Sequence, residues 1–318
     1  MSTTTKRKSI SYAKWGYIFI IPFFVVYITC SLIPLITTIY NSFFAIASDG
    51  GIDVINNGFI GFDNYARLFK PVAGELRILT YFTNTIIMWV MGAVPQFIFA
   101  LILAVLFTSA RLKIKGQTFF KTVIYMPNVI MAASFAILFF TLFSPVGPIN
   151  QIYQACSGAE AIRFFENPWA TRGIIAFINF LMWFGNTTIL LMAGILGIDQ
   201  SLFEAASIDG ANSGQVFFKI TLPLLMPILV YVAITSLIGG LQMFDVPQVI
   251  GDTVGDPQGS TKTMIMYLNQ LVGTRQYGLA GAVSVVIFII TAILSIFVYK
   301  SLVTGDNMKK AKKIKGGK

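Results

Sequence analysis

The sequence predicts an all-α integral membrane protein with six membrane-spanning helices and both termini in the cytoplasm. Hydrophobic residues make up 56% of the 318 residues and charged residues only 11%, which is not the composition of a water-soluble chain. An ionised side chain near the bilayer centre costs at least about 2.5 kcal/mol, so charges mark the ends of membrane spans. Six uncharged intervals are long enough for a spanning helix of roughly 20 residues: 15–48, 78–110, 122–159, 173–198, 220–244 and 276–299.

Each interval is predicted to hold one helix. The first is too long for a secretory signal and no A-x-A cleavage site follows it, which favours an uncleaved span. SPVGPINQ at 144–151 contains two prolines and a glycine, and it is predicted to leave the membrane as a loop. We therefore expect helices near 15–40, 79–107, 120–143, 173–196, 223–245 and 278–300.

The basic residues predict the orientation of the chain. With this arrangement of helices, sixteen of the 23 Lys and Arg residues lie on the side of the two termini, which is typical of the cytoplasmic side. The terminal KKAKKIKGGK lacks interleaved aromatic residues, so it is predicted to face lipid headgroups and not a nucleic acid. The predicted organisation is a basic tail (1–14), a first helix with an outer loop (15–78), a five-helix core (79–300) and a second basic tail (301–318).

The composition also excludes several chemistries. The chain has no histidine, so neither a Ser/His/Asp triad nor a His-containing zinc site can form. No GxxxxGK[ST] phosphate-binding loop is present, and the uncharged intervals hold no residue that could relay a proton. Cys30 and Cys156 are too few for a disulfide framework. We therefore expect a non-catalytic chain that binds no metal or cofactor and takes its energy from another protein.

The segment 198–227 between the fourth and fifth helices is predicted to form a helix, a turn and a second helix. Ser201 is expected to cap the first helix, because Glu204 follows at the capping-box spacing. Asp209-Gly210 is expected to form the turn, since glycine readily adopts positive φ. Pro223 suits the first turn of the next spanning helix.

Two interpretations of this segment remain open from composition alone. The small side chains of Ala205 and Ala206 could let the groove of another protein approach, and Glu204 could pair with a basic residue there. The first helix could instead lie in the plane of the headgroups as an interfacial helix.

This segment resembles the EAA loop of the membrane-spanning subunits of binding-protein-dependent ABC importers. The family pattern is EAA, then DGA, an aromatic position, I-x-LP and a second proline. The residues that match it are Glu204, Ala205, Ala206, Asp209, Gly210, Ala211, Phe217, Ile220, Leu222, Pro223 and Pro227.

Three further stretches are similar to carbohydrate permeases of that family. They are GFDNYARLF at 61–69, YMPNVI at 125–130 and FDVPQVIGDTVGDPQGST at 244–261. The chain departs from the family's usual GGP at Gly255-Asp256-Pro257, which places an additional carboxylate on this loop.

The resemblance implies a type I ABC importer transmembrane fold in a bacterial inner membrane. It implies as partners a second permease subunit, commonly a different chain, two ATPase subunits that carry ATP and Mg²⁺, and an extracytoplasmic sugar-binding protein. Residues implied to couple this chain to the ATPases are Glu204, Ala205, Ala206, Asp209 and Gly210.

The predicted substrate pathway follows from what a neutral sugar requires, namely polar hydrogen-bonding groups and aromatic faces between helices. Asn179, Trp183 and Asn186 are spaced four and three residues apart, so they share one face of the fourth helix. Gln242, Phe244 and Asp245 lie near the outer end of the fifth helix. Polar helix–helix contacts and an interfacial aromatic belt remain the other interpretation of these residues, and it is favoured for Asn84 and Gln96.

The rival function is a passive channel or a secondary transporter for a small polar solute. Such a protein would need no protrusion like 198–227.

Overall fold

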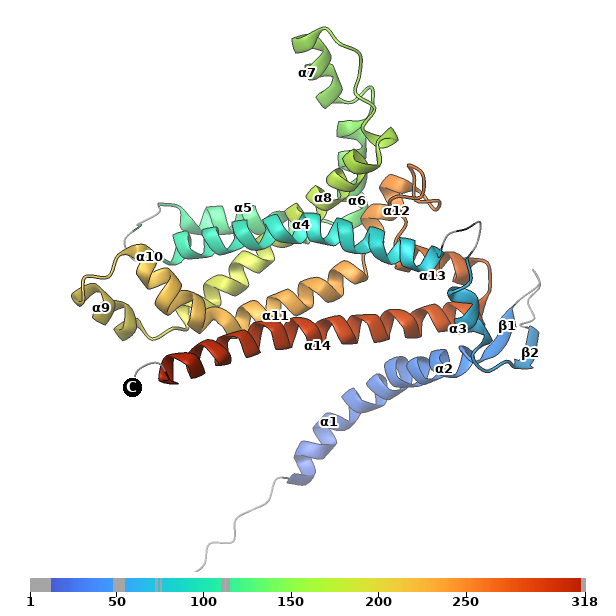
Figure 1. The fold of residues 1–318 in the computed structure, drawn as a ribbon, viewed down its shortest axis with the longest axis horizontal. Helices are drawn as coiled ribbons and strands as arrows, with labels where there is room; N and C mark the ends of the chain where they lie inside the picture. Colours follow the sequence, from blue (N-terminus) through green and yellow to red (C-terminus); the bar gives the residue numbers. More distant parts are fainter. Residues whose placement is uncertain are drawn as a thin grey trace, which may run out of the picture.

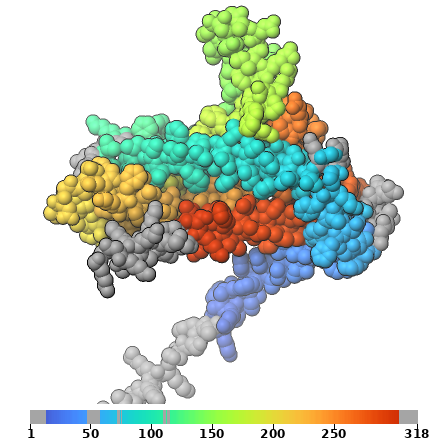
Figure 2. Space-filling view, viewed as in Figure 1, coloured from blue at the N-terminus to red at the C-terminus, as the bar shows by residue number. Residues whose placement is uncertain are grey.

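The computed structural model describes residues 13–47, 55–71, 74, 76–109, 112 and 115–315. Long helices run side by side and give an elongated bundle (Figures 1 and 2). Six of the described stretches are long and apolar enough to cross a membrane, as predicted: Lys14–Asn41, Arg77–Thr108, Ala132–Ser157, Pro168–Leu196, Ser213–Gly251 and Tyr277–Leu302.

The first span diverges from the bundle. It consists of α1 (Ala13–Tyr27), a π-turn η1 (Ile28–Leu32) and α2 (Ile33–Asn41). The described side chains of α1 are exposed, and only α2 lies against the bundle, where it packs on α14 (Tyr277–Lys315) (Figure 1). Gly281 makes this contact possible, because a Cβ there would lie 2.9 Å from the carbonyl oxygen of Thr38.

The loop after the first span is folded and adds a short two-stranded hairpin to the mostly helical fold. Strands β1 (Phe44–Ala47) and β2 (Ile55–Phe59) pair antiparallel, and the rings of Phe44 and Phe59 pack edge to face. The short helix α3 (Asp63–Leu68) follows. The side-chain amide of Asn64 donates to the carbonyl oxygens of Ser42 and Phe44, which ties α3 to the start of the hairpin.

The centre of the bundle is the pair α4 (Arg77–Thr108) and α8 (Pro168–Leu196), with α11 (Leu222–Leu241) and α14 beside it. Small residues allow close approach, since a Cβ at Gly92 would lie 2.9 Å from the carbonyl oxygen of Ala176. Helix α8 begins five residues before the predicted start, because the side chain of Asn167 accepts from the amides of Trp169 and Ala170 and caps it there.

The third predicted helix, 120–143, is two helices. Helix α5 (Gln117–Val129) ends at an extended Ile130, and α6 (Ala132–Phe143) begins two residues later. Pro127 lacks a backbone N–H and weakens the last turn of α5, which accounts for the break.

The prediction of a loop over 144–151 holds only for its first half. Pro148 occupies the first turn of a further helix, α7 (Pro148–Ser157), where proline is favoured. This helix stands away from the bundle and returns to α8 through the short 3₁₀ helix η2 (Phe164–Glu166) (Figure 1).

The last third of the chain adds two short helices between the fifth and sixth spans. Helix α11 ends at Leu241, four residues before the predicted end, and α12 (Asp245–Gly251) and α13 (Met264–Gly273) follow. Figure 1 places α13 and the hairpin at one end of the bundle and α9 at the other; we call these the α13 end and the α9 end.

Replacing Gly185 by alanine is expected to destabilise the α5–α8 contact. A Cβ at Gly185 would lie 2.0 Å from the carbonyl oxygen of Ile124, so the helices must separate, at a cost of about 1–3 kcal/mol. Gly173 of the same helix is the matched control, because a Cβ there has only the methyl group of Met91 near it, at 3.9 Å. Thermal unfolding in detergent should show a lower midpoint for Gly185→Ala and not for Gly173→Ala. Equal midpoints would contradict this packing.

Candidate functional site

The protrusion predicted over 198–227 is present at the α9 end of the bundle. It comprises α9 (Gln200–Ile208), a turn at Gly210 with φ of +72°, and α10 (Ser213–Val216). A π-turn, η3 (Phe217–Thr221), joins α10 to α11 without a break in the helix. The turn residue and the helix–turn–helix order are therefore confirmed, and the protrusion is continuous with a spanning helix.

The predicted cap of α9 is wrong. Ser201 lies inside the helix. The N-cap is Asp199, the residue before the first residue of α9, and its carboxylate accepts from the amide of Ser201 at 2.9 Å. The capping box of this segment belongs to α10, where the side chain of Asn212 accepts from the amide of Gln215 and the Gln215 side chain accepts from the amide of Asn212. The sequence carries the capping-box spacing at Ser201–Glu204 and again at Asn212–Gln215. Only the second pair forms a capping box in the structure.

Acid is expected to weaken this cap. The hydrogen bonds from Ser201 lower the pKa of Asp199 below its ordinary value of 3.8. The cap therefore stabilises α9 fully above that value and is lost as the pH falls through the lower pKa of the folded state. Hydrogen exchange should show that, in the wild type, protection of the Ser201 amide decreases as the pH is lowered. Asp199→Asn is the control, since asparagine caps a helix without titrating; a parallel loss in that variant would contradict the assignment.

The predicted coupling residues differ in exposure. Glu204, Ala205, Asp209 and Gly210 are exposed, whereas Ala206 is 7% exposed. The carbonyl oxygen of Ala206 accepts from the amide of Ala211, so this residue closes the turn. Ala206 therefore packs inside the protrusion, and the expectation that both alanines present a flat surface holds only for Ala205.

A cavity of about 490 Å³ separates α9 from the ends of the spanning helices. Phe203, Glu204 and Ser207 line it from α9, and Val105 and Ile195 line it from α4 and α8. Helix α9 has little packing of its own against the bundle and is joined to it by residues 197–199, which lead from α8, and by the turn at Gly210, which leads into α10 and α11.

A second cavity, of about 170 Å³, lies among α4, α8 and α11. Asn179, Trp183 and Asn186 line it together, as their spacing predicts. We call it the membrane cavity. Its polar and aromatic lining is Trp89, Gln96, Asn179, Trp183, Asn186, Thr187, Tyr231, Thr235 and Ser236.

The other three pathway candidates do not line the membrane cavity. Gln242 is the exposed C-cap of α11, Phe244 is the half-buried N-cap of α12, and Asp245 is the exposed first residue of α12. The helix end at Leu241 is the reason, because the chain turns away before these residues could continue the inner face of α11.

Sequence reasoning missed the cavity walls that α4 and α11 supply. The indole N–H of Trp89 donates to the hydroxyl of Ser236 at 3.3 Å, and Gln96, which was assigned to helix–helix contacts, donates to Thr187 at 2.8 Å while lining the cavity. Trp89 and Gln96 are seven residues apart and share a helix face, a spacing that could have indicated this wall.

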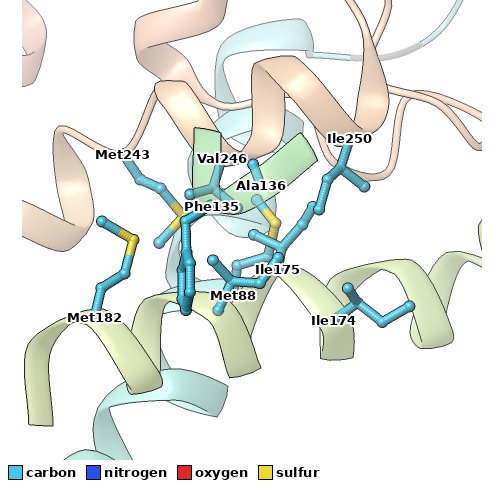
Figure 3. Packing of buried hydrophobic residues seen from close by; sticks show 10 residues of the cluster. Met88, Phe135, Ala136, Ile174, Ile175, Met182, Met243, Val246 and Ile250 are labelled. Carbon is cyan, nitrogen blue, oxygen red and sulfur yellow. The ribbon is translucent and has the colours of Figure 1, made fainter. Parts of the chain in front are cut away.

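Apolar clusters pack at both ends of the membrane cavity. Met88, Met182 and Met243 pack with Phe135 and Val246 on the α13 side (Figure 3). On the α9 side, Leu191, Leu225 and Val232 belong to a second cluster. The cavity is open along the side formed by the exposed rings of Trp183 and Tyr231, and its amide, hydroxyl and aromatic groups suit hydrogen bonding and stacking with a polar, uncharged ligand.

Six apolar spans, a polar compartment among them and a helical protrusion at one end define a multi-pass membrane transport subunit. The chain belongs to the family of binding-protein-dependent transport system inner membrane components, whose model matches residues 72–304. Subunits of this family are non-catalytic transport components that work with a separate ATPase.

Sugar permeases are among the relatives that match over nearly the whole chain. The lactose transport system permease protein LacF of Rhizobium radiobacter is 30% identical over 92% of this chain and 96% of its own length. The multiple sugar-binding transport system permease protein MsmF of Streptococcus mutans is 29% identical over 90% of this chain and 94% of its own.

The fold is also that of a solved transporter. A chain of the bacterial alginate ABC transporter, in complex with an alginate pentasaccharide-bound periplasmic protein, superposes with a TM-score of 0.73 at 20% identity, covering 90% of this chain and 93% of that one. The helices of this chain are therefore arranged as they are in that transporter chain.

Proposed function

We propose that this chain is the permease subunit of an ATP-driven importer for a sugar or oligosaccharide. The observation that carries the proposal is the continuity of the protrusion with α11, since α11 also forms a wall of the membrane cavity. A push on α9 from an ATPase would pass through Gly210 into a helix that touches the substrate compartment.

The proposed assembly contains a second permease subunit, two ATPase subunits on the protrusions and an extracytoplasmic sugar-binding protein. The proposed location is a bacterial inner membrane, with the α9 end and both termini in the cytoplasm. The family membership and the relatives that transport sugars support this assembly. The excess of Lys and Arg on the side of the termini supports the orientation.

An uncharged saccharide is the substrate class that the membrane cavity favours. Its lining supplies three side-chain amides, several hydroxyls and three large aromatic rings, and it contains no Asp, Glu, Lys or Arg. A carboxylate there would lose its hydration without gaining a cation. Isothermal titration of the purified complex with neutral oligosaccharides and with their uronate analogues tests this class; tighter binding of the uronates would contradict it.

A passive channel or secondary transporter remains the second candidate. It is disfavoured because the chain belongs to a family whose subunits work with a separate ATPase.

The native cysteines test the proposed orientation. Cys156 is exposed on α7 and is the second-to-last residue of the candidate span Ala132–Ser157, at the end that the proposed orientation places opposite to the termini. A membrane-impermeant maleimide added to intact cells should therefore label the wild type, and Cys156→Ser should abolish that labelling. Cys30→Ser is the matched control and should leave it unchanged, because Cys30 lies within the first span. Labelling of Cys156 only after the cells are opened would contradict the orientation.

A further inference from the structure

The segment between α12 and α13, residues 252–263, lies directly over the α13 end of the membrane cavity; we call it the outer segment. The hydroxyl of Thr263 donates to the carbonyl oxygen of Met243, which lines the cavity. The amide of Met264 donates to Thr85, one residue from Asn84 and nearly a turn from the cavity residue Met88. The outer segment is therefore held at the end of the cavity where this apolar cluster lies; Figure 3 shows the cluster.

Two side chains from distant helices hold this segment by its carbonyl oxygens. The amide of Asn84 on α4 donates to the carbonyl oxygens of Gly259 at 2.9 Å and Lys262 at 3.2 Å. Arg172 on α8 donates through Nε to the carbonyl oxygen of Ser260 at 3.0 Å and through Nη2 to Oδ1 of Asn84 at 2.7 Å. Asn84 is 3% exposed; its bond to Lys262 is buried, and the other three bonds are partly buried. We call Arg172 and Asn84 the clamp.

The positive charge of the clamp is met by neutral oxygen atoms and by the ring of Trp169, whose centroid lies 5.0 Å from the guanidinium carbon of Arg172. Among the described residues, neither Arg172 nor the nearby Lys262 has a carboxylate within 4.0 Å. Lys262 is 7% exposed; its ammonium donates to Gln270 and lies over the ring of Tyr81. Hydrogen bonds from a charged donor are stronger than neutral ones, so removing the guanidinium should free the segment.

The held conformation is itself unfavourable at several points. Asp252 has φ of +54° and ψ of −173°, a region that is almost exclusive to glycine, and Gln258 has φ of +57°. The hydroxyl of Ser260 is buried with no hydrogen-bond partner in the structure. Strain and an unsatisfied hydroxyl both favour release, because an opened segment could relax its backbone and hydrate Ser260. The clamp opposes them.

We propose that Arg172 and Asn84 are positioning residues that clamp the strained outer segment shut over the membrane cavity, and that release of this clamp opens the cavity to the extracytoplasmic side. The hydrogen bonds of Asn84, Arg172 and Thr263 to the backbone support the closure. The statement that a saccharide enters there rests on the proposed function.

Thiol accessibility in the assembled importer tests the clamp. A cavity cysteine, Ser236→Cys, is introduced into a Cys30→Ser, Cys156→Ser background. A membrane-impermeant, cationic methanethiosulfonate is then applied to the outer face without ATP. Arg172→Gln should raise the modification rate at least about tenfold, the factor that corresponds to one charge-assisted hydrogen bond.

Two further variants make the result specific. Asn84→Asp keeps the acceptor for Arg172 but removes the donor to Gly259 and Lys262, so it should also raise the rate. Arg163→Gln is the matched control and should leave it unchanged, because Arg163 is exposed and pairs only with Glu166, at 3.0 Å, in the same outer region.

Unchanged rates in both clamp variants, or an equal rise in Arg163→Gln, would overturn the inference. Labelling reports access and not uptake, so the two proposals fail separately. Faster labelling in clamp variants of a complex that transports no saccharide would retain the clamp and contradict the proposed function.

Discussion

Replacing Gly210 by proline is expected to reduce ATP-driven uptake by at least about a hundredfold while the chain still inserts into the membrane. The turn requires φ of +72° at this position, and proline is fixed near −65°. An incompatible proline costs about 3 kcal/mol or more, which is about a hundredfold in the population of the native turn. Since the turn is the main connection between α9 and α11, its loss should disconnect the ATPases from the cavity.

The control for this prediction is Gly210→Asn. Asparagine tolerates positive φ better than other residues with a side chain, and a Cβ at this position meets no atom within 4 Å. Uptake into vesicles and co-purification of the ATPase should both survive in this variant and fail in Gly210→Pro. Glu204→Lys should weaken ATPase docking as well, because it reverses an exposed charge on α9. Normal uptake in Gly210→Pro and Glu204→Lys would refute the coupling role.

The second large effect is expected at Asn186. This half-buried amide lines the membrane cavity and makes no hydrogen bond to another described residue, so it is available to a ligand. Asn186→Leu removes these hydrogen-bonding groups while keeping the number of side-chain heavy atoms, and uptake should fall about tenfold, the effect of one lost hydrogen bond. The ATPase activity stimulated by the binding protein should persist, because the coupling path is intact.

Asp245→Ala provides the comparison for Asn186→Leu. Both positions are pathway candidates from the sequence, but the structure places Asp245 on an exposed turn of α12, outside the lining of the cavity. Uptake should therefore change little in Asp245→Ala. Equal losses in the two variants would show that the substrate passes outside this cavity.

Charge spacing was enough to count the six spans and to place five of them, because the cost of a charge in lipid acts on every helix independently of its neighbours. The ends of the helices depend on local bonds that spacing does not reveal. Asn167 starts α8 early, and the break after Pro127 separates α5 from the third span, Ala132–Ser157, which lies later in the chain than the predicted helix 120–143. Asp199, and not Ser201, caps α9 since the backbone at 199 is extended.

The site was predictable where its residues share one helix. Asn179, Trp183 and Asn186 were found together because their spacing places them on one face of α8. The walls from α4 and α11 and the bonds between Asn84, Arg172 and the outer segment join residues up to 178 positions apart, so only tertiary packing brings them together. A single sequence carries no signal for that pairing.

The most direct test of the central claim is saccharide uptake into proteoliposomes that enclose ATP. Vesicles containing the complete complex, with the binding protein outside, should accumulate saccharide above its external concentration. Vesicles that lack the ATPase, or that contain this chain alone, should accumulate none. Movement of saccharide through this chain alone would contradict the account and establish a passive or secondary route.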